Sequence, residues 1–193
     1  MLCCGLWLLG RPAHRKISKQ IKHKYHAFIT KIYNAHKNNV KRVVYAASSS
    51  TYGDSKSLPK VEDKIGKPLS PYAISKYVNE QTAENFKKIY NLDCVGLRYF
   101  NVFGRRQDTE STYAAVIPKF VQALMRNENP VINGDGTYSR DFTYIDNVIQ
   151  ANLLAASTNN HEALNQVFNV ACGTQTDLNK LFNIVKNELS VYD

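Results

Sequence analysis

Glycine is scarce in this chain of 193 residues. Its nine glycines stand at positions 5, 10, 53, 66, 96, 104, 134, 136 and 173. They cannot form a Gly-x-x-Gly-x-x-Gly loop, in which glycines let the backbone approach a dinucleotide pyrophosphate at a helix N-terminus. The sequence therefore contains no recognisable pyrophosphate-binding loop.

Acidic residues are absent from the first 53 positions, which hold ten Lys or Arg, whereas the remaining 140 positions hold 15 basic and 16 acidic residues. Such asymmetry can mark an arm that binds nucleic acid or an anionic surface. No nucleic-acid-binding motif accompanies it, so we expect no nucleic-acid partner. We interpret residues 1–39 as a divergent, basic upstream part of the fold that the rest of the chain forms, with a helix over residues 21–39 whose apolar face includes Phe28 and Ile32.

Cysteine is also sparse, and its spacing indicates no disulfide framework. Cys3 and Cys4 are adjacent, and Cys94 and Cys172 fall within or just after predicted buried strands. Reduced thiols are typical of the cytoplasm, which is the expected location.

Long apolar runs are missing. The segment Met1–Leu9 is apolar but far too short to span a membrane, and it lacks the basic start of a secretory signal. We interpret it as a remnant strand and expect no membrane association. His23 and His26 have the spacing of metal ligands, yet no cysteine or carboxylate completes a site, so no metal is expected.

What the chain does contain is a set of residues suited to proton transfer. The serines Ser48–Ser50 end a predicted strand, and Tyr72 and Lys76 follow at helical i and i+4 positions. Ser70 is a good N-cap and Pro71 suits the first helical position, so Tyr72 falls in the first turn. A nearby ammonium favours the ionised form of a phenol, which suits a tyrosine to act as a general base.

The Tyr-x-x-x-Lys pattern alone is weak, because it occurs three times here. The other two sets are Tyr33 with Lys37 and Tyr52 with Lys56. We interpret both as ordinary surface pairs, the second in a loop. Only Tyr72 follows both a strand ending in serines and a clear helix start, the order that a site at the carboxyl edge of a parallel sheet requires.

The hydrophobic pattern predicts a β-α-β unit followed by a mixed region. Strands are expected at 43–47 and 94–99 with a helix at 72–90 between them. The later elements are expected as a helix at 118–126, strands at 131–132 and 142–145, a helix at 147–156, a strand at 167–171 and a helix after Thr176.

Five ordered blocks resemble the extended short-chain dehydrogenase/reductases, specifically the NAD-dependent epimerase/dehydratase family, from about Val40 to Leu189. The blocks are Ala46–Asp54, Lys67–Lys76, Leu97–Gly104, Asn133–Gly136 and Ser139–Asp146. The resemblance implies an α/β fold: the C-terminal half of a Rossmann-like, doubly wound parallel sheet plus part of a small substrate-binding domain. It divides the chain into a basic prefix with one helix (1–39), the half-domain with the catalytic segment (40–113) and a mainly substrate-binding region (114–193).

The resemblance also implies roles for single residues. The catalytic set would be Ser48, Tyr72 and Lys76; the NAD pocket would include Ala46, Tyr72, Lys76 and Tyr99; the nucleotide-sugar would contact Ser48, Ser50, Asn101, Val116, Val131 and Arg140. Among these, Val116 and Val131 would flank the uracil, and Asn101 and Arg140 would bind phosphate. Two alternatives stay open: a capping or turn role for any one serine, and a surface ion pair between Arg140 and Asp141.

The positions after Ser48 favour epimerisation. Family dehydratases place Asp-Glu there, whereas this chain has Ser49 and Ser50. The resemblance therefore implies 4-epimerisation through a 4-keto sugar with NAD as hydride carrier. The blocks Gly104–Asp108 and Tyr113–Lys119 are most similar to members acting on UDP-N-acetylglucosamine and UDP-N-acetylgalactosamine.

Relatives of this kind have a glycine-rich loop upstream and a further substrate segment downstream, and full-length members form homodimers. We therefore expect a chain truncated at both ends. Two functional interpretations remain: an NAD-dependent UDP-sugar epimerase or a genuine piece of one, and an inactive remnant that at most associates with an intact relative.

Overall fold

The computed structural model describes residues 12–108, 116–132 and 134–189, with side chains from Tyr25 onward. The chain divides into two compact units. Unit 1 comprises residues 1–98 and 152–169, and unit 2 comprises residues 99–151 and 170–193. The segment Met1–Leu9, expected as a remnant strand, lies outside the described residues.

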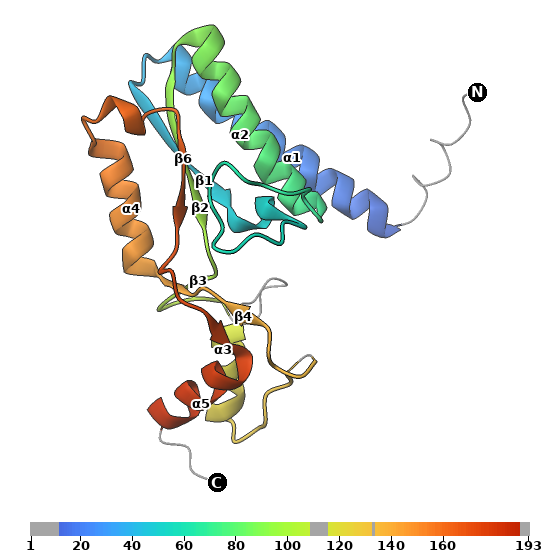
Figure 1. The fold of residues 1–193 in the computed structure, drawn as a ribbon. Coiled ribbons are helices and arrows are strands. Elements are labelled where there is room, and N and C mark those ends of the chain that lie inside the picture. The colour runs from blue at the N-terminus through green and yellow to red at the C-terminus, as the bar shows by residue number, and fades with distance from the viewer. Residues whose placement is uncertain (1–11, 109–115, 133, 190–193) are drawn as a thin grey trace. The chain divides into compact units, whose positions relative to one another are not determined.

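Unit 1 is built on a three-stranded parallel sheet in the order β1-β2-β6 (Figure 1). The strands are β1 (Arg42–Ser48), β2 (Asp93–Tyr99) and β6 (Val167–Val170). The helices α1 (Pro12–Lys37) and α2 (Pro71–Tyr90) pack against each other, and α2 also packs against β1. This arrangement confirms the predicted α/β fold with a partial Rossmann-like parallel sheet.

The sequence of α2 explains both its ends. At its start, the Ser70 side chain accepts a hydrogen bond from the Ala73 amide, and Pro71 occupies the first turn. At its end, Asn91 adopts a left-handed conformation (φ 53°), and its amide donates to the Lys87 carbonyl. The helix start predicted from Ser70 and Pro71 is confirmed.

The core of unit 1 lies between these two helices and the sheet. Ile32 of α1 is 1% exposed and packs with Tyr45 and Ala47 of β1. Phe28 meets the Tyr45 ring edge-on, with ring centroids 5.4 Å apart. The apolar face predicted around Phe28 and Ile32 therefore faces this core.

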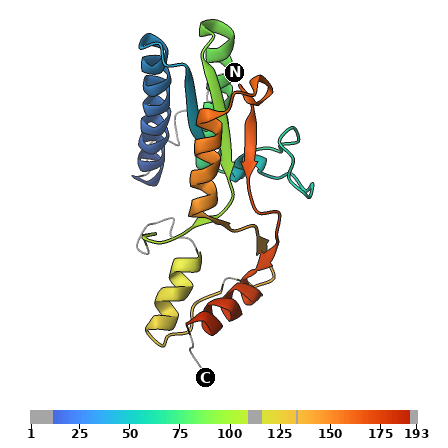
Figure 2. The same cartoon turned by 90° about the vertical axis from the view of Figure 1, so that its left-hand side faces the viewer.

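On the other face of the sheet lies the C-terminal half of α4 (Ile145–Ser157), as Figures 1 and 2 show. Arg42 fastens β1 to this helix, because one of its guanidinium nitrogens donates to the carbonyls of Ala155 and Ala156, both at 3.0 Å. The short 3₁₀ helix η2 (His161–Ala163) then leads into β6.

The strand β1 ends at Ser48, and the chain turns directly into the 3₁₀ helix η1 (Ser49–Tyr52). Gly53 closes this turn with φ 52°, and a Cβ there would come within 1.8 Å of the Lys67 carbonyl oxygen. Ser49 thus belongs to a helical turn rather than to an extended strand end.

Unit 2 combines two helices with short strand pairs. Its elements are β3 (Val102–Phe103), α3 (Val116–Met125), β4 (Ser139–Arg140), β5 (Thr143–Tyr144), β7 (Thr176–Asp177) and α5 (Leu178–Glu188). β3 pairs with β5 in parallel, and β4 pairs with β7 antiparallel. The core of this unit forms between α3 and α5, where Phe120, Leu124, Leu181 and Val185 are buried.

One predicted element is wrong. Residues 131–132 form no strand; Val131 follows Pro130 and is 85% exposed, so an apolar dipeptide here does not indicate a buried strand. The division at residues 40 and 114 stays a prediction. Within the described part of the chain, no helix is long and apolar enough to cross a membrane.

Candidate active site

The serine turn places two hydroxyls side by side. Ser48 is 8% exposed, and its Oγ accepts hydrogen bonds from the Ser50 amide at 3.2 Å and from the Ser50 hydroxyl at 2.9 Å. The Thr51 hydroxyl donates to the Ser48 carbonyl at 2.8 Å. Ser48 therefore does cap a turn, the alternative role considered for it, and the same contacts hold its hydroxyl in place.

Tyr72 and Lys76 share one face of α2. The Lys76 Nζ lies 5.8 Å from the centroid of the Tyr72 ring. It also donates a hydrogen bond to the Ala46 carbonyl on β1 at 2.8 Å. Tyr72 is 38% exposed.

The predicted catalytic residues occur on adjoining elements of unit 1. α2 packs against both β1 and η1. Ala46, which receives the Lys76 hydrogen bond, precedes Ser48 by two residues on β1. A tyrosine, a cation and a hydroxyl thus lie on adjoining elements near the carboxyl end of a parallel strand, where ligands of open α/β sheets bind.

Three of the predicted nucleotide-binding residues line one pocket of unit 2. Val116, Val131 and Arg140 border a cavity of about 680 Å³ together with Lys119 and Phe120. Its volume falls in the range of small-molecule sites, roughly 300–1,000 Å³. Its walls combine apolar side chains with two cationic side chains and the carboxylate of Glu128.

Asn101 lies elsewhere in unit 2. Its amide nitrogen donates to the Asp141 carbonyl at 2.8 Å, and its φ is 27°. The Asp141 carboxylate accepts hydrogen bonds from the Cys172 and Gly173 amides at 2.9 and 2.7 Å. Among the described residues it forms no ion pair with Arg140, so the alternative role considered for Arg140 is not supported.

A buried network that sequence reasoning missed lies behind the serine turn. Arg98 of β2 is 4% exposed and donates to both carboxylate oxygens of Glu80 at 3.0 and 2.8 Å. It also donates to the Tyr52 hydroxyl at 3.2 Å. Burial lowers the pKa of the Arg98 guanidinium, but the hydrogen bonds and charge of Glu80 outweigh burial and hold that pKa above its usual range.

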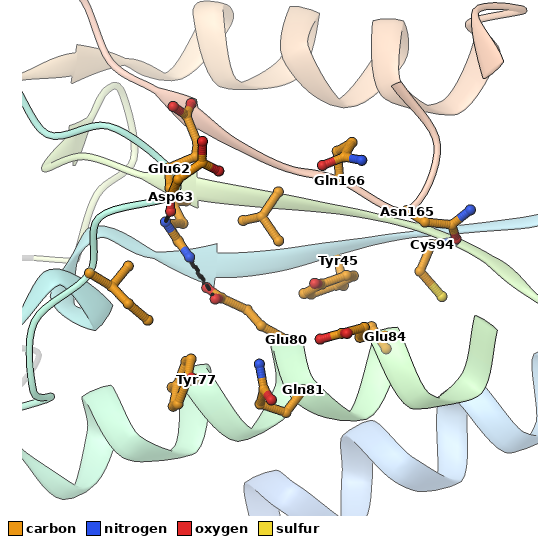
Figure 3. Close-up of a pocket in the computed structure, with 14 residues that line it drawn as sticks. Tyr45, Glu62, Asp63, Tyr77, Glu80, Gln81, Glu84, Cys94, Asn165 and Gln166 are labelled. Carbon is orange, nitrogen blue, oxygen red and sulfur yellow. Dashed lines mark hydrogen bonds and ion pairs between the residues drawn. The ribbon is translucent and has the colours of Figure 1, made fainter. Parts of the chain in front are cut away.

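A pocket of about 390 Å³ adjoins this network (Figure 3). Tyr45, Glu80 and Glu84 project into the space between the sheet and α2, and Cys94 lies beside them. Burial raises the pKa of Cys94 to about 12, and burial with the nearby Glu80 charge raises the pKa of Tyr45 above its usual range. Across the described residues, no group of three or more His, Cys, Asp or Glu is arranged to hold a metal ion.

A β-α-β unit with a tyrosine–lysine pair on its helix and a serine turn after its first strand is typical of a Rossmann-like enzyme class. Residues 14–171 match the model of the NAD dependent epimerase/dehydratase family. The chain belongs to this family.

Similarity to individual proteins agrees with this assignment. A putative UDP-glucose 4-epimerase of Methanocaldococcus jannaschii is 37% identical over 163 residues, which cover 81% of this chain and 52% of that protein. The chain thus spans about half the length of the curated relatives it matches.

Two solved structures have a similar fold. The UDP-N-acetylglucosamine 4-epimerase of Methanobrevibacter ruminantium M1, in complex with UDP-N-acetylmuramic acid, has a TM-score of 0.84 and 39% identity, covering 94% of this chain and 58% of that one. The UDP-glucose 4-epimerase of Thermotoga maritima, with UDP-glucose, has a TM-score of 0.85 and 36% identity, covering 93% and 57%.

Proposed function

We propose that this chain carries the catalytic segment of an NAD-dependent UDP-sugar 4-epimerase, acting on UDP-N-acetylglucosamine and UDP-N-acetylgalactosamine. The observation that carries the proposal is the fastening of Lys76 to Ala46, because it holds the cation beside Tyr72 and next to the strand end that bears Ser48. Family membership and the similarity to two UDP-sugar 4-epimerases support the same chemistry.

The donor set suits the nicotinamide-ribose end of NAD. The Lys76 ammonium lies at the carboxyl end of the sheet and offers N–H donors to ribose hydroxyls. Ala46, Tyr72 and Tyr99 complete the proposed cofactor-binding residues. NAD, when bound, supplies a hydride acceptor for the sugar C4 carbon and a donor for its return. No residue of this chain is proposed to hold the pyrophosphate of NAD.

Tyr72 moves the proton in the proposed reaction. It takes the proton from the C4 hydroxyl as that carbon is oxidised, and it returns the proton when the 4-keto sugar is reduced from its other face. The Lys76 ammonium stabilises the phenolate, and the Ser48 hydroxyl hydrogen-bonds the C4 oxygen. Ser50, whose hydroxyl lies 2.9 Å from that of Ser48, is proposed to contact the sugar as well.

The nucleotide moiety is assigned to unit 2. Val116 and Val131 are proposed to flank the uracil, and Arg140 to bind a phosphate, since all three border one pocket. A guanidinium offers several fixed donors to phosphate oxygens. Asn101 is proposed as a second diphosphate ligand. Association as a homodimer, which the family resemblance implies, stays a prediction.

An epimerisation assay tests this function. The purified protein is incubated with NAD and UDP-N-acetylglucosamine, and UDP-N-acetylgalactosamine is followed by ¹H NMR of the anomeric proton. UDP-glucose and UDP-glucuronic acid are compared as substrates. We expect turnover that is fastest with the acetylated sugar and that Tyr72→Phe abolishes almost completely. A folded protein that converts none of these sugars would support the inactive-remnant interpretation instead, and near-normal turnover by Tyr72→Phe would refute the assigned chemistry.

A further inference from the structure

A buried network of hydrogen bonds connects α2, which carries Tyr72 and Lys76, with η1, which directly follows Ser48. None of these three residues belongs to the network. Its centre is the ion pair between Arg98 and Glu80, whose side chains are each 5% exposed. Glu80 points from α2 toward the sheet, where dashed lines in Figure 3 mark its two bonds to the guanidinium. A buried, two-point pair of this kind fixes both distance and direction between its elements.

A second arm of the network reaches the serine turn. Arg98 donates to the Tyr52 hydroxyl, and its guanidinium carbon lies 5.0 Å from the Tyr52 ring centroid. The Tyr52 hydroxyl donates to the Asn169 side-chain oxygen on β6 at 2.7 Å. Tyr52 is 3% exposed and ends η1, the 3₁₀ helix that Ser48 caps, so its interpretation as part of a surface pair with Lys56 is wrong. Each contact lies within unit 1.

The loop between η1 and α2 is tied into the same network. Arg98 donates to the Glu62 carbonyl at 3.0 Å. The Glu62 carboxylate accepts from the Asn169 amide at 2.8 Å, and the Asn169 side chain donates to the Lys60 carbonyl at 2.9 Å. One guanidinium therefore links four parts of the chain: α2, β2, η1 and this loop.

Helical periodicity places Glu80 on the same side of α2 as Tyr72 and Lys76. Glu80 follows Lys76 by one turn and Tyr72 by two, so the three residues lie along neighbouring positions of one side of α2. Lys76 fastens this side to β1 through Ala46, and Glu80 fastens it to β2 through Arg98. The helix is thus held at two successive turns.

We propose that Arg98, together with Glu80 and Tyr52, is a positioning residue that sets the separation between the Tyr72 hydroxyl on α2 and the Ser48 hydroxyl before η1. This inference rests on the proposed function for its effect on turnover. Proton transfer is sensitive to such spacing, because a misplacement of about 1 Å can reduce a rate by about 10²-fold.

The chain provides a matched control for Arg98. Arg42 lies on β1, is partly buried and also ties its strand to a helix by hydrogen bonds, but its partners Ala155 and Ala156 belong to α4 on the other face of the sheet. Arg98→Lys and Arg42→Lys both keep the charge and remove the planar fork of donors. A purely structural role predicts a loss of stability in either variant, with kcat and the surroundings of Tyr72 unchanged in the protein that folds.

The test measures turnover of UDP-N-acetylglucosamine by both variants. We expect Arg98→Lys to lower kcat by about ten- to a hundredfold while KM changes by less than about threefold, since substrate contacts are kept and alignment is lost. Arg42→Lys is expected to keep kcat within about twofold. Equal kcat for Arg98→Lys and Arg42→Lys, both folded by circular dichroism, would overturn the proposal.

A second readout does not depend on activity. With ¹³Cζ-labelled tyrosine, the Tyr72 resonance is assigned by its loss in Tyr72→Phe. We expect that resonance to shift or broaden in Arg98→Lys and to stay in place in Arg42→Lys. An unchanged resonance in folded Arg98→Lys would refute the positioning role even if the protein proved inactive. A shifted resonance in an inactive protein would instead support the positioning role while the proposed function fails.

Tyr52→Phe is a milder substitution that tests the proposal if Arg98→Lys does not fold. Tyr52→Phe removes one hydroxyl from the network and leaves the Arg98–Glu80 pair intact. We expect it to move the Tyr72 resonance in the same direction and to lower kcat by about three- to tenfold. A folded Tyr52→Phe protein with an unchanged resonance would overturn the proposal.

Discussion

Lys76 donates a hydrogen bond from Nζ to the backbone carbonyl of Ala46 at 2.8 Å. This single contact joins the helix that carries Tyr72 to the strand that ends in Ser48. The same ammonium lies 5.8 Å from the Tyr72 ring centroid, so the lysine stays beside the tyrosine.

Replacing Lys76 tests the cation directly. Lys76→Met removes the ammonium while keeping an unbranched side chain, so we expect turnover to fall by about 10²-fold and NAD affinity to weaken. Lys88→Met is the matched control, because Lys88 lies on the same helix in an exposed pair with Glu84. Equal activity of the two variants would contradict the assigned role of Lys76.

Ser48 is expected to contribute more to turnover than Ser49. Ser48→Ala removes the hydroxyl proposed to hold the C4 oxygen, and we expect turnover to fall by roughly 10² to 10⁴-fold. Ser49→Ala serves as the control and should stay within about threefold of the unmodified protein. The comparison is made by the same ¹H NMR assay, and a Ser49→Ala effect as large as that of Ser48→Ala would reverse the assignment.

Arg140 is expected to recognise phosphate through its planar fork. Arg140→Lys keeps the charge but loses two-point donation, so the Kd for UDP, measured by calorimetry, should rise about tenfold. Arg126, an exposed arginine outside this pocket, provides the control variant Arg126→Lys, for which no change is expected. An unchanged Kd in Arg140→Lys would remove Arg140 from the proposed nucleotide site.

The ion pair between Asp93 and Lys87 is expected to make the free energy of unfolding weakly dependent on pH in acid. The hydrogen bond from Lys87 to Asp93, at 2.7 Å, is the main reason that the pKa of Asp93 lies below its usual range. Because the folded pKa lies below the unfolded value of about 3.9, the stabilisation is present above that value and is lost as pH falls through the folded pKa. The pair is partly exposed, so its contribution should not exceed about 1 kcal/mol.

The measurement is urea unfolding of the unmodified protein and of Asp93→Asn between pH 7 and pH 3. We expect the variant to be less stable at pH 7 and the two curves to converge in acid. The exposed Asp63→Asn substitution is the control and should run parallel to the unmodified protein. A gap for Asp93→Asn that stays constant down to pH 3 would show that charge is not the cause.

The features that were predicted best from the sequence depend only on residues that are close together in the chain. The start of α2 follows from Ser70 and Pro71, whose effects reach only to the next turn. The strand that ends in Ser48 follows from its short apolar run, and the pairing of Tyr72 with Lys76 follows from helical spacing. The family resemblance added Val116, Val131 and Arg140, which border one pocket although nothing local indicates a shared site.

The network around Arg98 was not predictable in the same way. Its partners Glu80 and Tyr52 stand 18 and 46 positions away, so no local pattern relates them. One signal was present: an arginine within the apolar run of β2 is a buried charge that requires a partner. The apolar pair at residues 131–132 led to the wrong prediction of a strand. Val131 borders a pocket, and apolar residues line pockets as well as core strands.

The proposed function requires that this chain bind NAD and a UDP-sugar. The most direct measurement is isothermal titration of the folded protein with NAD, alone and in the presence of UDP-N-acetylglucosamine, with Lys76→Met in parallel. We expect saturable binding of one NAD per chain, weakened in Lys76→Met. No binding by a demonstrably folded protein, with or without the UDP-sugar, would contradict the proposed function.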